Sequence, residues 1–350
     1  MPVDLAARSG HLVDPYGGAI DLEARLLRAV GDPDARFAED ALRLMRAARF
    51  AARFGMRLDP ATEAAIRRNS GLAATLSGER VREELFRILG TADAAEPPSA
   101  AFLLMERLGM LEVVLPELAA LRGVPQDKAL AGDALDHSLR TADELPADDP
   151  LLRLVGLFHD IGKASTLGDG HFIGHEDVGA DLAETTLRRL RLSRRAIGRA
   201  VHLIRTHMFG YRPDWTDAAV RRFVRRVGPA ALADLYALRE ADNAASGVRE
   251  GTTGGLGELR ERANRELART ALSTRQLAVD GEDLIAELAI SPGPIIGRLL
   301  ARLLEAVVED PARNERGTLI NLARGWLPEE SEMPSGPSRR SATVVRERTR

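Results

Sequence analysis

Residues 36–54 read RFAEDALRLMRAARFAARF, and this stretch decides the fold class. Its apolar positions recur at the spacing of one helix face: Leu42, Met45, Ala48 and Ala52. The charged side chains fall on another face, which is typical of a helix that is buried on one side only. Leu, Ala, Arg and Glu, which all favour helix, also dominate the rest of the chain. The sequence therefore predicts a mainly α protein.

Breaks in the helical pattern divide the 350 residues into segments, and near the N-terminus these breaks fall at 31–33, 55–60 and 77–78. Residues 1–20 hold a short extended stretch at 11–13 and a turn at 14–18, and a strand this short is unstable alone. We expect these residues to be the end of a larger domain with a short β remnant. The other expected segments are two helical domains at 21–125 and 130–250, a helical C-terminal body at 258–328 and a disordered tail at 329–350.

The composition limits the classes of function. Hydrophobic residues make up 45% and charged residues 29%, as in ordinary globular proteins, and a net charge of −3 gives no global attraction to RNA. The absence of cysteine excludes disulfides and thiolate ligands, so a metal would need His and carboxylate ligands. We find no signal peptide and no apolar run of about 18 residues, which predicts a cytoplasmic protein that does not contact a membrane.

Four charged side chains of the opening stretch form a candidate base-recognition set: Glu39, Asp40, Arg43 and Arg46. In a helix they would make solvated ion pairs, each contributing about 0.2–0.5 kcal/mol, and this purely structural interpretation stays open. The alternative rests on base chemistry. Cytosine and adenine present an amine beside a ring-nitrogen acceptor, which a carboxylate and an arginine can bind together. Asp40 with Arg43 would accept these bases and reject uracil and guanine, while Glu39 would orient Arg43.

The surrounding sequence resembles bacterial CCA-adding tRNA nucleotidyltransferases and the related poly(A) polymerases. The resemblance rests on LVDPYGG at 12–18, on EDALRLMR at 39–46 and on residues 283–311, and it covers nearly the whole chain. In this family the motif EDxxRxxR templates the incoming nucleotide. The resemblance therefore implies CTP and ATP as substrates of the four charged residues, and tRNA as the partner of the neck at 21–125 and of the C-terminal body. A second neck motif, RxxxEL, falls on Arg80 and Glu84 and is mainly structural in the family.

The polymerising head of the family carries a Gly-Gly turn and an Asp-x-Asp pair, which holds two Mg²⁺ ions. Gly17-Gly18 with Asp21 and Glu23 imitates this pattern, but it lies in the stretch that follows the catalytic carboxylates in the family. We therefore expect residues 1–20 to be a remnant of the head, whether the cause is a miscalled start, a fragment or a true truncation. The chain as given should not polymerise nucleotides, and CTP incorporation into a tRNA that lacks CCA would contradict this expectation.

Histidines and aspartates form a second constellation between 130 and 250. A single histidine is more often a core or surface residue with a satisfied partner, but here the residues follow an ordered pattern. That pattern, H…HD…H…H…D, includes HDIGK and a downstream GHE, and it resembles the HD phosphohydrolase superfamily: His137, His159, Asp160, His175, His207 and Asp242. We expect His171 and His202 to be bystanders, and His11 lies outside the cluster.

Imidazole and carboxylate ligands suit Mn²⁺, Fe, Ni²⁺, Co²⁺ or Zn²⁺. We expect one ion to be bound by the first two histidines and both aspartates, with Asp160 bridging to a second ion on His175 and His207. Such an ion activates water for attack on a phosphoester. The expected catalytic residues are His159, Asp160 and Lys163, the last of which would contact phosphate.

Three functions follow from these patterns. The first is a CCA-adding tRNA nucleotidyltransferase with an HD domain, represented here by its neck and RNA-binding body. The second is a stand-alone metal-dependent phosphohydrolase or 2′,3′-cyclic phosphodiesterase. The third is a non-catalytic RNA-binding remnant. The sequence leaves open the identity of the metal, the extent of CCA addition and the oligomeric state.

Overall fold

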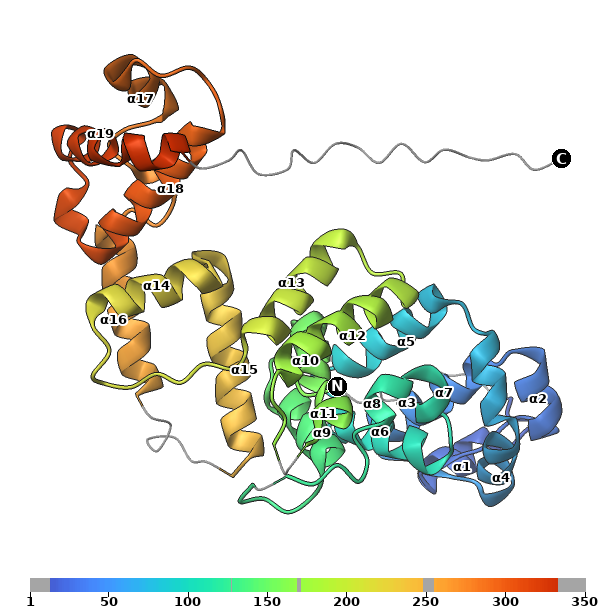
Figure 1. Ribbon diagram of the computed structural model, residues 1–350. Coiled ribbons are helices and arrows are strands. Elements are labelled where there is room, and N and C mark those ends of the chain that lie inside the picture. Colours follow the sequence, from blue (N-terminus) through green and yellow to red (C-terminus); the bar gives the residue numbers. More distant parts are fainter. Residues whose placement is uncertain (1–12, 127, 169–170, 248–254, 333–350) are drawn as a thin grey trace, which may run out of the picture. The chain divides into compact units, whose positions relative to one another are not determined.

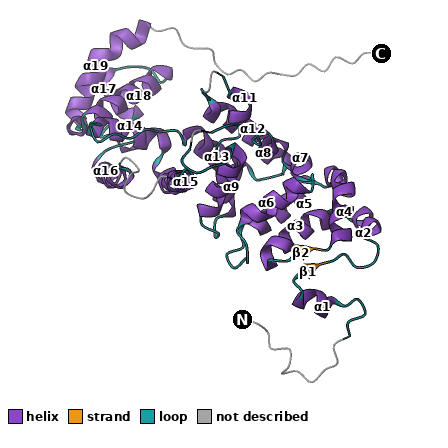
Figure 2. Cartoon of the chain, turned by 90° about the horizontal axis from the view of Figure 1, so that it is seen from below, coloured by secondary structure: helices purple, strands orange, loops and turns teal. Residues whose placement is uncertain are grey.

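The computed structural model describes residues 13–126, 128–168, 171–247 and 255–332, and they form two compact units of helices (Figures 1 and 2). The first unit comprises Met1–Gly210 and Ala231–Thr253, and the second comprises Tyr211–Ala230 and Gly254–Arg350. Two strands, β1 (Leu26–Leu27) and β2 (Arg57–Leu58), pair in parallel and make the only sheet in the described ranges. The prediction of a mainly α protein is confirmed.

The N-terminal helices of the first unit begin and end where the sequence predicts its main breaks. These helices are α1 (Gly18–Glu23), α2 (Pro33–Glu39), α3 (Leu42–Phe54), α4 (Pro60–Asn69), α5 (Gly78–Leu89), α6 (Pro98–Arg107), α7 (Leu111–Val114) and α8 (Pro116–Ala119). Side-chain oxygens of Asp59 and Ser77 accept backbone N–H groups at the starts of α4 and α5. Gly55 ends α3 with a left-handed φ of 60°, which glycine adopts without strain. A turn is also present at Asp14, whose carbonyl accepts the N–H of Gly17.

The prediction of one continuous helix for residues 36–54 is wrong, because the helix is interrupted at residues 40–41, between α2 and α3. Asp40 has extended backbone angles, φ −150° and ψ 102°. Its side-chain Oδ1 accepts the backbone N–H of Leu42 at 3.1 Å. Aspartate competes in this way with the helical hydrogen bonds of its own backbone, which ends one helix and starts the next. The apolar face itself is present, since Met45, Ala48 and Ala52 are buried, and Leu42 is half-buried.

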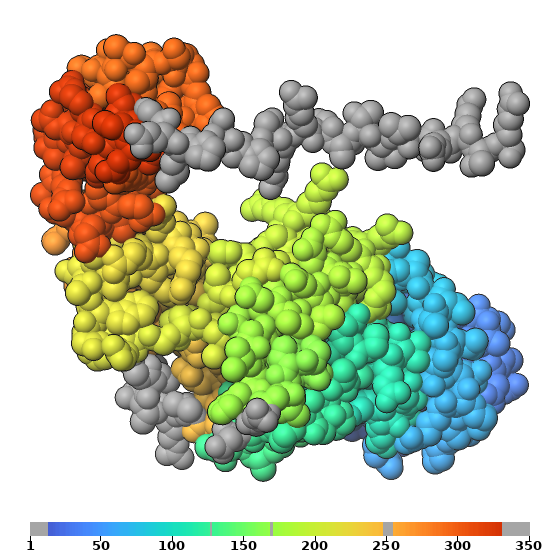
Figure 3. All heavy atoms as spheres, viewed as in Figure 1, coloured from blue at the N-terminus to red at the C-terminus, as the bar shows by residue number. Residues whose placement is uncertain are grey.

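Six further helices complete the first unit: α9 (Ala134–Glu144), α10 (Pro150–Phe158), α11 (Lys163–Thr166), α12 (His175–Arg189), α13 (Arg194–Thr206) and α15 (Leu232–Ala245). α10 and α15 both pack against α9, and α12 packs against α13. The side chains of α10 are buried from Leu152 to Phe158, so the residues that follow this helix enter the interior of the unit. In Figure 3 the residues coloured blue to green form one continuous packed body.

The second unit contains α14 (Asp217–Val227), α16 (Leu256–Arg269), α17 (Gly281–Leu288), α18 (Pro294–Glu309) and α19 (Arg316–Glu332). Its core includes Leu284, Leu299, Leu303 and Leu319, which are all fully buried. α19 continues to Glu332, so the disordered tail predicted from residue 329 begins within a helix, and the rest of that tail lies outside the described residues. His11 and Leu12 of the predicted N-terminal strand also lie outside them. Among the helices that the structure describes, none is long and apolar enough to cross a membrane.

Candidate metal centre and nucleotide pocket

The side chains predicted to bind metal come from five different helices of the first unit, and the fold brings them together. All are buried: His137 in the first turn of α9, His159 and Asp160 directly after α10, His175 at the start of α12, His207 directly after α13, and Asp242 near the end of α15. The apolar α10 explains why an adjacent His-Asp pair stands in the interior. Each ligand therefore sits at or near a helix end, where packing fixes its backbone.

Asp160 lies at the centre of the cluster, with one carboxylate oxygen toward each pair of histidines. Its Oδ2 lies 3.2 Å from Nε2 of His159 and 3.6 Å from Nε2 of His137. Its Oδ1 lies 3.3 Å from Nε2 of His175 and 3.7 Å from Nε2 of His207. In each of the two triads that share Asp160, the ligand atoms lie within 4.8 Å of one another. This spacing suits two metal positions bridged by one carboxylate.

Asp242 joins the first of these triads. Its Oδ1 lies 3.1 Å from Nε2 of His137, and its Oδ2 lies 3.4 Å from Nη1 of Arg239. The guanidinium of Arg239 also donates to the backbone carbonyl oxygens of His207 and Phe209, at 2.7 and 2.9 Å. Arg239 thus connects the aspartate of α15 to the turn that carries the histidine of the second triad.

Hydrogen bonds at the opposite ring nitrogens prepare three of the histidines for metal binding. Nδ1 of His159, His175 and His207 lies 2.6–2.8 Å from the backbone carbonyl oxygen three residues earlier. Donation from Nδ1–H leaves Nε2 unprotonated and turned into the cluster, which is the usual arrangement of metal-binding histidines. Within the described residues, Nε2 of all four histidines is buried and has no hydrogen-bond partner. Four ring nitrogens without hydrogen-bond partners around a buried carboxylate fit a metal centre. In a core that holds no metal, buried polar atoms of this kind normally have hydrogen-bond partners.

The pKa shifts of the cluster suit a metal at every shifted ligand except His175, where the contact with Asp160 outweighs burial and raises the pKa. Burial lowers the pKa of His137 and His207, which keeps these imidazoles neutral. Burial would raise the pKa of Asp160, but His159 and the contacts from His175 and His207 hold that pKa well below its usual range. Burial acts in the same way on Asp242, and there the contact with His137 outweighs it and lowers the pKa. Both carboxylates are therefore ionised at neutral pH.

A cavity of about 650 Å³ opens onto the two carboxylates, and three cations line it: Lys128, Lys163 and Arg239. Nζ of Lys163 donates to Asp160 Oδ2 at 2.6 Å and to Gln126 Oε1 at 3.1 Å, so the lysine predicted to contact phosphate does stand at the site. His171, which the sequence assigns as a bystander, also lines this cavity. No motif in the sequence assigns a role to Lys128 or Arg239. Their only local signal is that Lys128 is one of two lysines in the chain.

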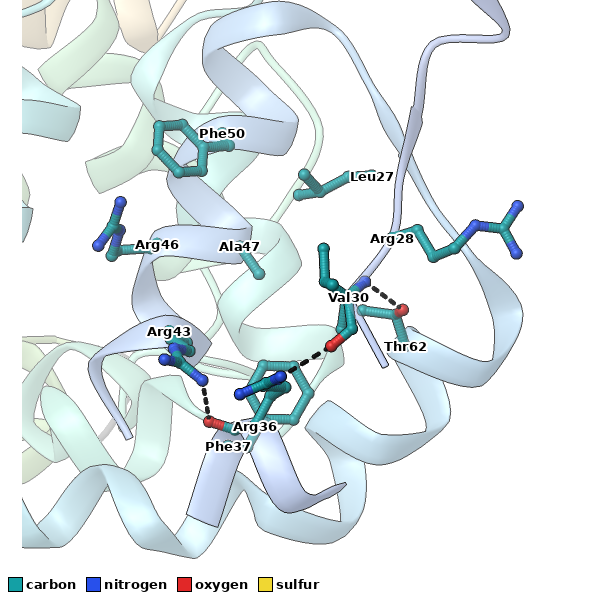
Figure 4. Close-up of a pocket in the computed structure, with 11 residues that line it drawn as sticks. Leu27, Arg28, Val30, Arg36, Phe37, Arg43, Arg46, Ala47, Phe50 and Thr62 are labelled. Carbon is teal, nitrogen blue, oxygen red and sulfur yellow. Dashed lines mark hydrogen bonds between the residues drawn. The ribbon is translucent and has the colours of Figure 1, made fainter. Parts of the chain in front are cut away.

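A second cavity, of about 400 Å³, lies beside α3 and the backbone of residues 27–30 (Figure 4). Arg43 and Arg46 line it, with apolar walls from Phe37 and Phe50. Nη1 of Arg43 donates to Glu39 Oε2 at 2.8 Å, which is the orienting contact predicted for Glu39. In Figure 4 the guanidinium of Arg43 also reaches the carbonyl oxygen of Arg36, at 3.0 Å.

The first neck motif contacts the second through one ion pair, and the second motif also joins two helices of the neck. The carboxylate of Asp40 accepts Nη2 of Arg80 at 2.9 and 3.1 Å, so the first motif contacts the second. Glu84 is fully buried and accepts Nε of Arg49 at 2.6 Å and Nη1 of Arg87 at 2.5 Å. These contacts join α5 to α3 and give the second motif a structural role.

Two family models match separate segments of the chain. Residues 55–121 match a model described as "Probable RNA and SrmB- binding site of polymerase A". Residues 175–323 match a model of tRNA nucleotidyltransferase domain 2.

Curated relatives extend the similarity over most of the chain. An A-adding tRNA nucleotidyltransferase of Deinococcus radiodurans is 36% identical over 322 residues, which are 86% of this chain and 72% of the relative. A CC-adding tRNA nucleotidyltransferase of Thermus thermophilus is 36% identical over 86% of this chain and 70% of its own length. A Multifunctional CCA protein of Chromobacterium violaceum is 44% identical over 53% of this chain and 46% of its own length.

A solved structure supports the fold. The CCA-adding enzyme of Bacillus stearothermophilus, crystallised with CTP, matches 91% of this chain with a TM-score of 0.61 and 24% identity. The match covers 70% of that chain. At this identity the likeness speaks for the arrangement of helices alone.

Proposed function

The chain belongs to the family of bacterial tRNA nucleotidyltransferases, and from that premise we propose that it serves the maturation of tRNA 3′ ends with CTP and ATP as nucleotides. The support is its identity to enzymes named for A and CC addition over most of its length. In this proposal Glu39, Asp40, Arg43 and Arg46 select the base, and the C-terminal helices bind tRNA. Mg²⁺ is the metal of the polymerising step in this family, and it is held by head carboxylates rather than by these four residues.

The geometry gives its strongest support to a second activity, a metal-dependent phosphohydrolase site within this family member. The observation that carries it is the set of four buried Nε2 atoms, without hydrogen-bond partners in the described residues, around both oxygens of Asp160. A purely structural cluster would satisfy such nitrogens. A metal-dependent centre for phosphoester hydrolysis needs these Nε2 atoms unprotonated, so that they can bind the metal.

In this proposal His137, His159, Asp160 and Asp242 would hold one divalent ion, and Asp160, His175 and His207 would hold a second. A divalent ion there would supply Lewis acidity toward the phosphoryl group and toward water. The chain supplies the rest. Asp160 would offer one carboxylate oxygen to each position, and Lys163 would neutralise phosphate charge. The backbone carbonyl oxygens behind three of the rings hold those histidines in their metal-binding tautomer.

The experiment measures metal content and hydrolysis together on the purified protein. Elemental analysis should find a transition metal, and the protein should hydrolyse a 2′,3′-cyclic or monoester nucleotide after loading with Mn²⁺, Ni²⁺, Co²⁺, Fe²⁺ or Zn²⁺. His159→Ala and Asp160→Ala should lose both the metal and the hydrolysis. A wild-type protein that binds none of these metals would exclude the phosphohydrolase and leave the tRNA proposal in place.

A further inference from the structure

The two lysines of the chain occupy one cavity. Of its 49 Lys and Arg residues, all but Lys128 and Lys163 are arginine. Ion pairs elsewhere in the described residues are made by arginine, both at exposed positions such as Arg188 and at buried ones such as Arg49. In a sequence so biased toward arginine, the two lysines lie 35 residues apart, and both line the cavity above the candidate metal ligands. The compact ammonium group is therefore the property that these positions share.

Each lysine stands beside a different candidate ligand carboxylate. Nζ of Lys163 lies 2.6 Å from Asp160 Oδ2. Nζ of Lys128 lies 3.3 Å from Asp242 Oδ1 and 2.8 Å from Oγ of Ser246. Both ammonium groups are held at the carboxylate face of the cavity, where a phosphoryl group would have to approach the metal ligands.

Charge balance alone does not require Lys128. Asp242 already has the guanidinium of Arg239 at 3.4 Å from its Oδ2. The side chain of Lys128 is 25% exposed and lines the cavity. A lysine that served only to neutralise Asp242 would be redundant.

We propose that Lys128 and Lys163 form a two-lysine phosphate clamp, which makes the site select dianionic phosphate monoesters over monoanionic diesters. The proposal rests on the phosphohydrolase activity proposed above and names its substrate class. A point-like ammonium beside a metal ligand leaves an open face toward phosphate. The guanidinium of Arg239, the third cation of this cavity, instead donates to the backbone carbonyl oxygens of His207 and Phe209.

The charge of the ligand gives the proposal a quantitative signature. Coulomb energy scales with the product of the charges, so removal of one cation costs a dianion about twice the free energy that it costs a monoanion at the same distance. Since free energy is logarithmic in affinity, the fold-loss for the monoester should be about the square of the fold-loss for the diester. A loss of about 10-fold for the diester would thus accompany a loss of about 100-fold for the monoester.

The experiment uses the full chain loaded with Mn²⁺ and compares wild type with Lys128→Met, Lys128→Arg and Arg205→Met. Arg205 is the matched control, because it pairs with Asp177 and Asp181 on the surface of the same unit and does not line the cavity. kcat/KM is measured for adenosine 2′-monophosphate and adenosine 2′,3′-cyclic monophosphate, whose shared base cancels in the ratio. Calorimetry measures binding of inorganic phosphate as the dianion and dimethyl phosphate as the monoanion, and metal content and Tm are recorded for each variant.

The expected result is that Lys128→Met keeps its metal and its Tm but loses the monoester preference in both measurements, with the squared relation. Lys128→Arg should retain the preference at lower affinity, because the charge remains, and Arg205→Met should match wild type. Equal losses for both anions, or no loss, would overturn the clamp while leaving the hydrolase in place. Absence of metal from the wild type would instead defeat the hydrolase, and the phosphate titration would still decide whether Lys128 binds the dianion.

Discussion

Gly162 shows how one residue of the HDIGK segment shapes the centre. Its backbone angles, φ −67° and ψ −20°, are open to any residue, so glycine is not there for conformational freedom. An added Cβ would lie 2.1 Å from the carbonyl oxygen of His175 and 2.7 Å from the amide nitrogen of Gly179. The missing side chain lets α12 approach the turn after α10, which brings His175 to Asp160.

Substitution of this glycine should therefore harm both the packing and the centre. Gly162→Ala is expected to lower the free energy of unfolding by about 1–3 kcal/mol, as overpacking against backbone does, and to reduce the metal bound per chain. Gly198→Ala is the matched control, because nothing lies within 4 Å of its added Cβ and it stands inside α13. The free energy of unfolding of the Gly198→Ala protein should rise by up to about 1 kcal/mol. Denaturant unfolding and elemental analysis measure the pair, and equal stabilities would refute the steric argument.

Arg43 should decide nucleotide preference in the second cavity. If its guanidinium donates to the ring nitrogen of cytosine or adenine, Arg43→Ala should weaken CTP and ATP binding by about 10- to 100-fold, since a hydrogen bond to a charged group contributes about 1.5–3 kcal/mol. Glu39→Gln should weaken it less, because Glu39 only orients Arg43. Arg68→Ala, which removes an exposed cation paired with Asp34, is the control. Equilibrium titration with CTP, ATP, GTP and UTP is the measurement, and unchanged CTP binding in Arg43→Ala would remove this residue from base selection.

At this scale the sequence predicted those residues whose type and order form a pattern. The six side chains of the candidate metal centre follow such a pattern, and the fold brings all six together. Lys128 and Arg239 belong to no motif, and Lys128 reaches Asp242 across 114 positions of sequence. Such a contact exists only after α9 and α15 have packed, so the order of residues along the chain does not predict it.

At the scale of elements, the break at Asp40 shows the limit of periodicity. The apolar positions Leu42, Met45, Ala48 and Ala52 keep a helical spacing, and the pattern predicts one helix over residues 36–54 where the structure has two. A local feature, the aspartate at position 40, indicates the break instead. Aspartate favours caps and turns, and the bond from Leu42 N–H to Asp40 uses that preference. The break turns the Asp40 carboxylate toward Arg80 on α5, away from the continuous helix face that the sequence predicts.

The buried pair between α3 and α5 should contribute strongly to stability. Glu84 is fully buried, and Glu84→Gln would leave the buried guanidinium of Arg49 without its charge partner. Breaking a buried pair in this way costs about 3–5 kcal/mol. Glu83→Gln is the neighbouring control, because that side chain is 56% exposed and lies 3.8 Å from Arg87, so its loss should cost less than about 1 kcal/mol. Urea unfolding of both variants measures the difference, and a similar small loss for Glu84→Gln would show that α5 is held by apolar packing alone.

An ion-pair cluster between α10, α13 and α15 should make stability depend on acid pH. Asp149 accepts the N–H of Leu152 at 3.0 Å and pairs with Arg199, which also contacts Asp234 at 2.7 Å. Burial would raise the pKa of Asp149, but the Arg199 and Leu152 contacts outweigh it and lower the pKa. A lowered folded-state pKa stabilises the fold above the ordinary pKa, and this stabilisation is lost as the pH falls below it.

The free energy of unfolding should therefore decline from about pH 5 to about pH 3, with at most about 1.4 kcal/mol per pH unit from this one group. Asp149→Asn should be less stable at neutral pH and should show a shallower decline over the same range. Chemical unfolding at a series of pH values tests both statements. A decline in Asp149→Asn as steep as in wild type would assign the acid sensitivity to other carboxylates.

At the scale of the whole molecule, the division into units could be predicted only in part. The helices were foreseen from their periodicity, but residues 211–230 lie within the segment 130–250 that the sequence predicts as one domain, and they join the second unit. Their membership depends on contacts such as Arg221 with Glu266 at 2.7 Å and with the carbonyl oxygen of Val308 at 2.5 Å. These partners lie 45 and 87 positions away, so composition and local pattern do not reveal them.

This division predicts how metal should stabilise the protein. All candidate ligands belong to the first unit, whereas the core around Leu303 lies entirely in the second. An ion that binds only the folded state stabilises it by about 2.7 kcal/mol at 100 times its dissociation constant. Calorimetry should therefore show two unfolding transitions, and chelation by EDTA should lower the temperature of the first unit's transition only. Leu303→Ala opens a cavity at a fully buried position and should lower the free energy of unfolding of the second unit by about 2–5 kcal/mol. The effect of EDTA on the first unit should be unchanged.

Asp160→Asn supplies the complementary control, because it removes the shared carboxylate while the second unit stays intact. Its metal-dependent transition should no longer respond to EDTA, and the transition of the second unit should keep its wild-type temperature. If chelation shifted both transitions in the wild type, the two units would unfold as one cooperative body, and ligand binding at the histidine cluster would then stabilise the helices around Leu303 as well.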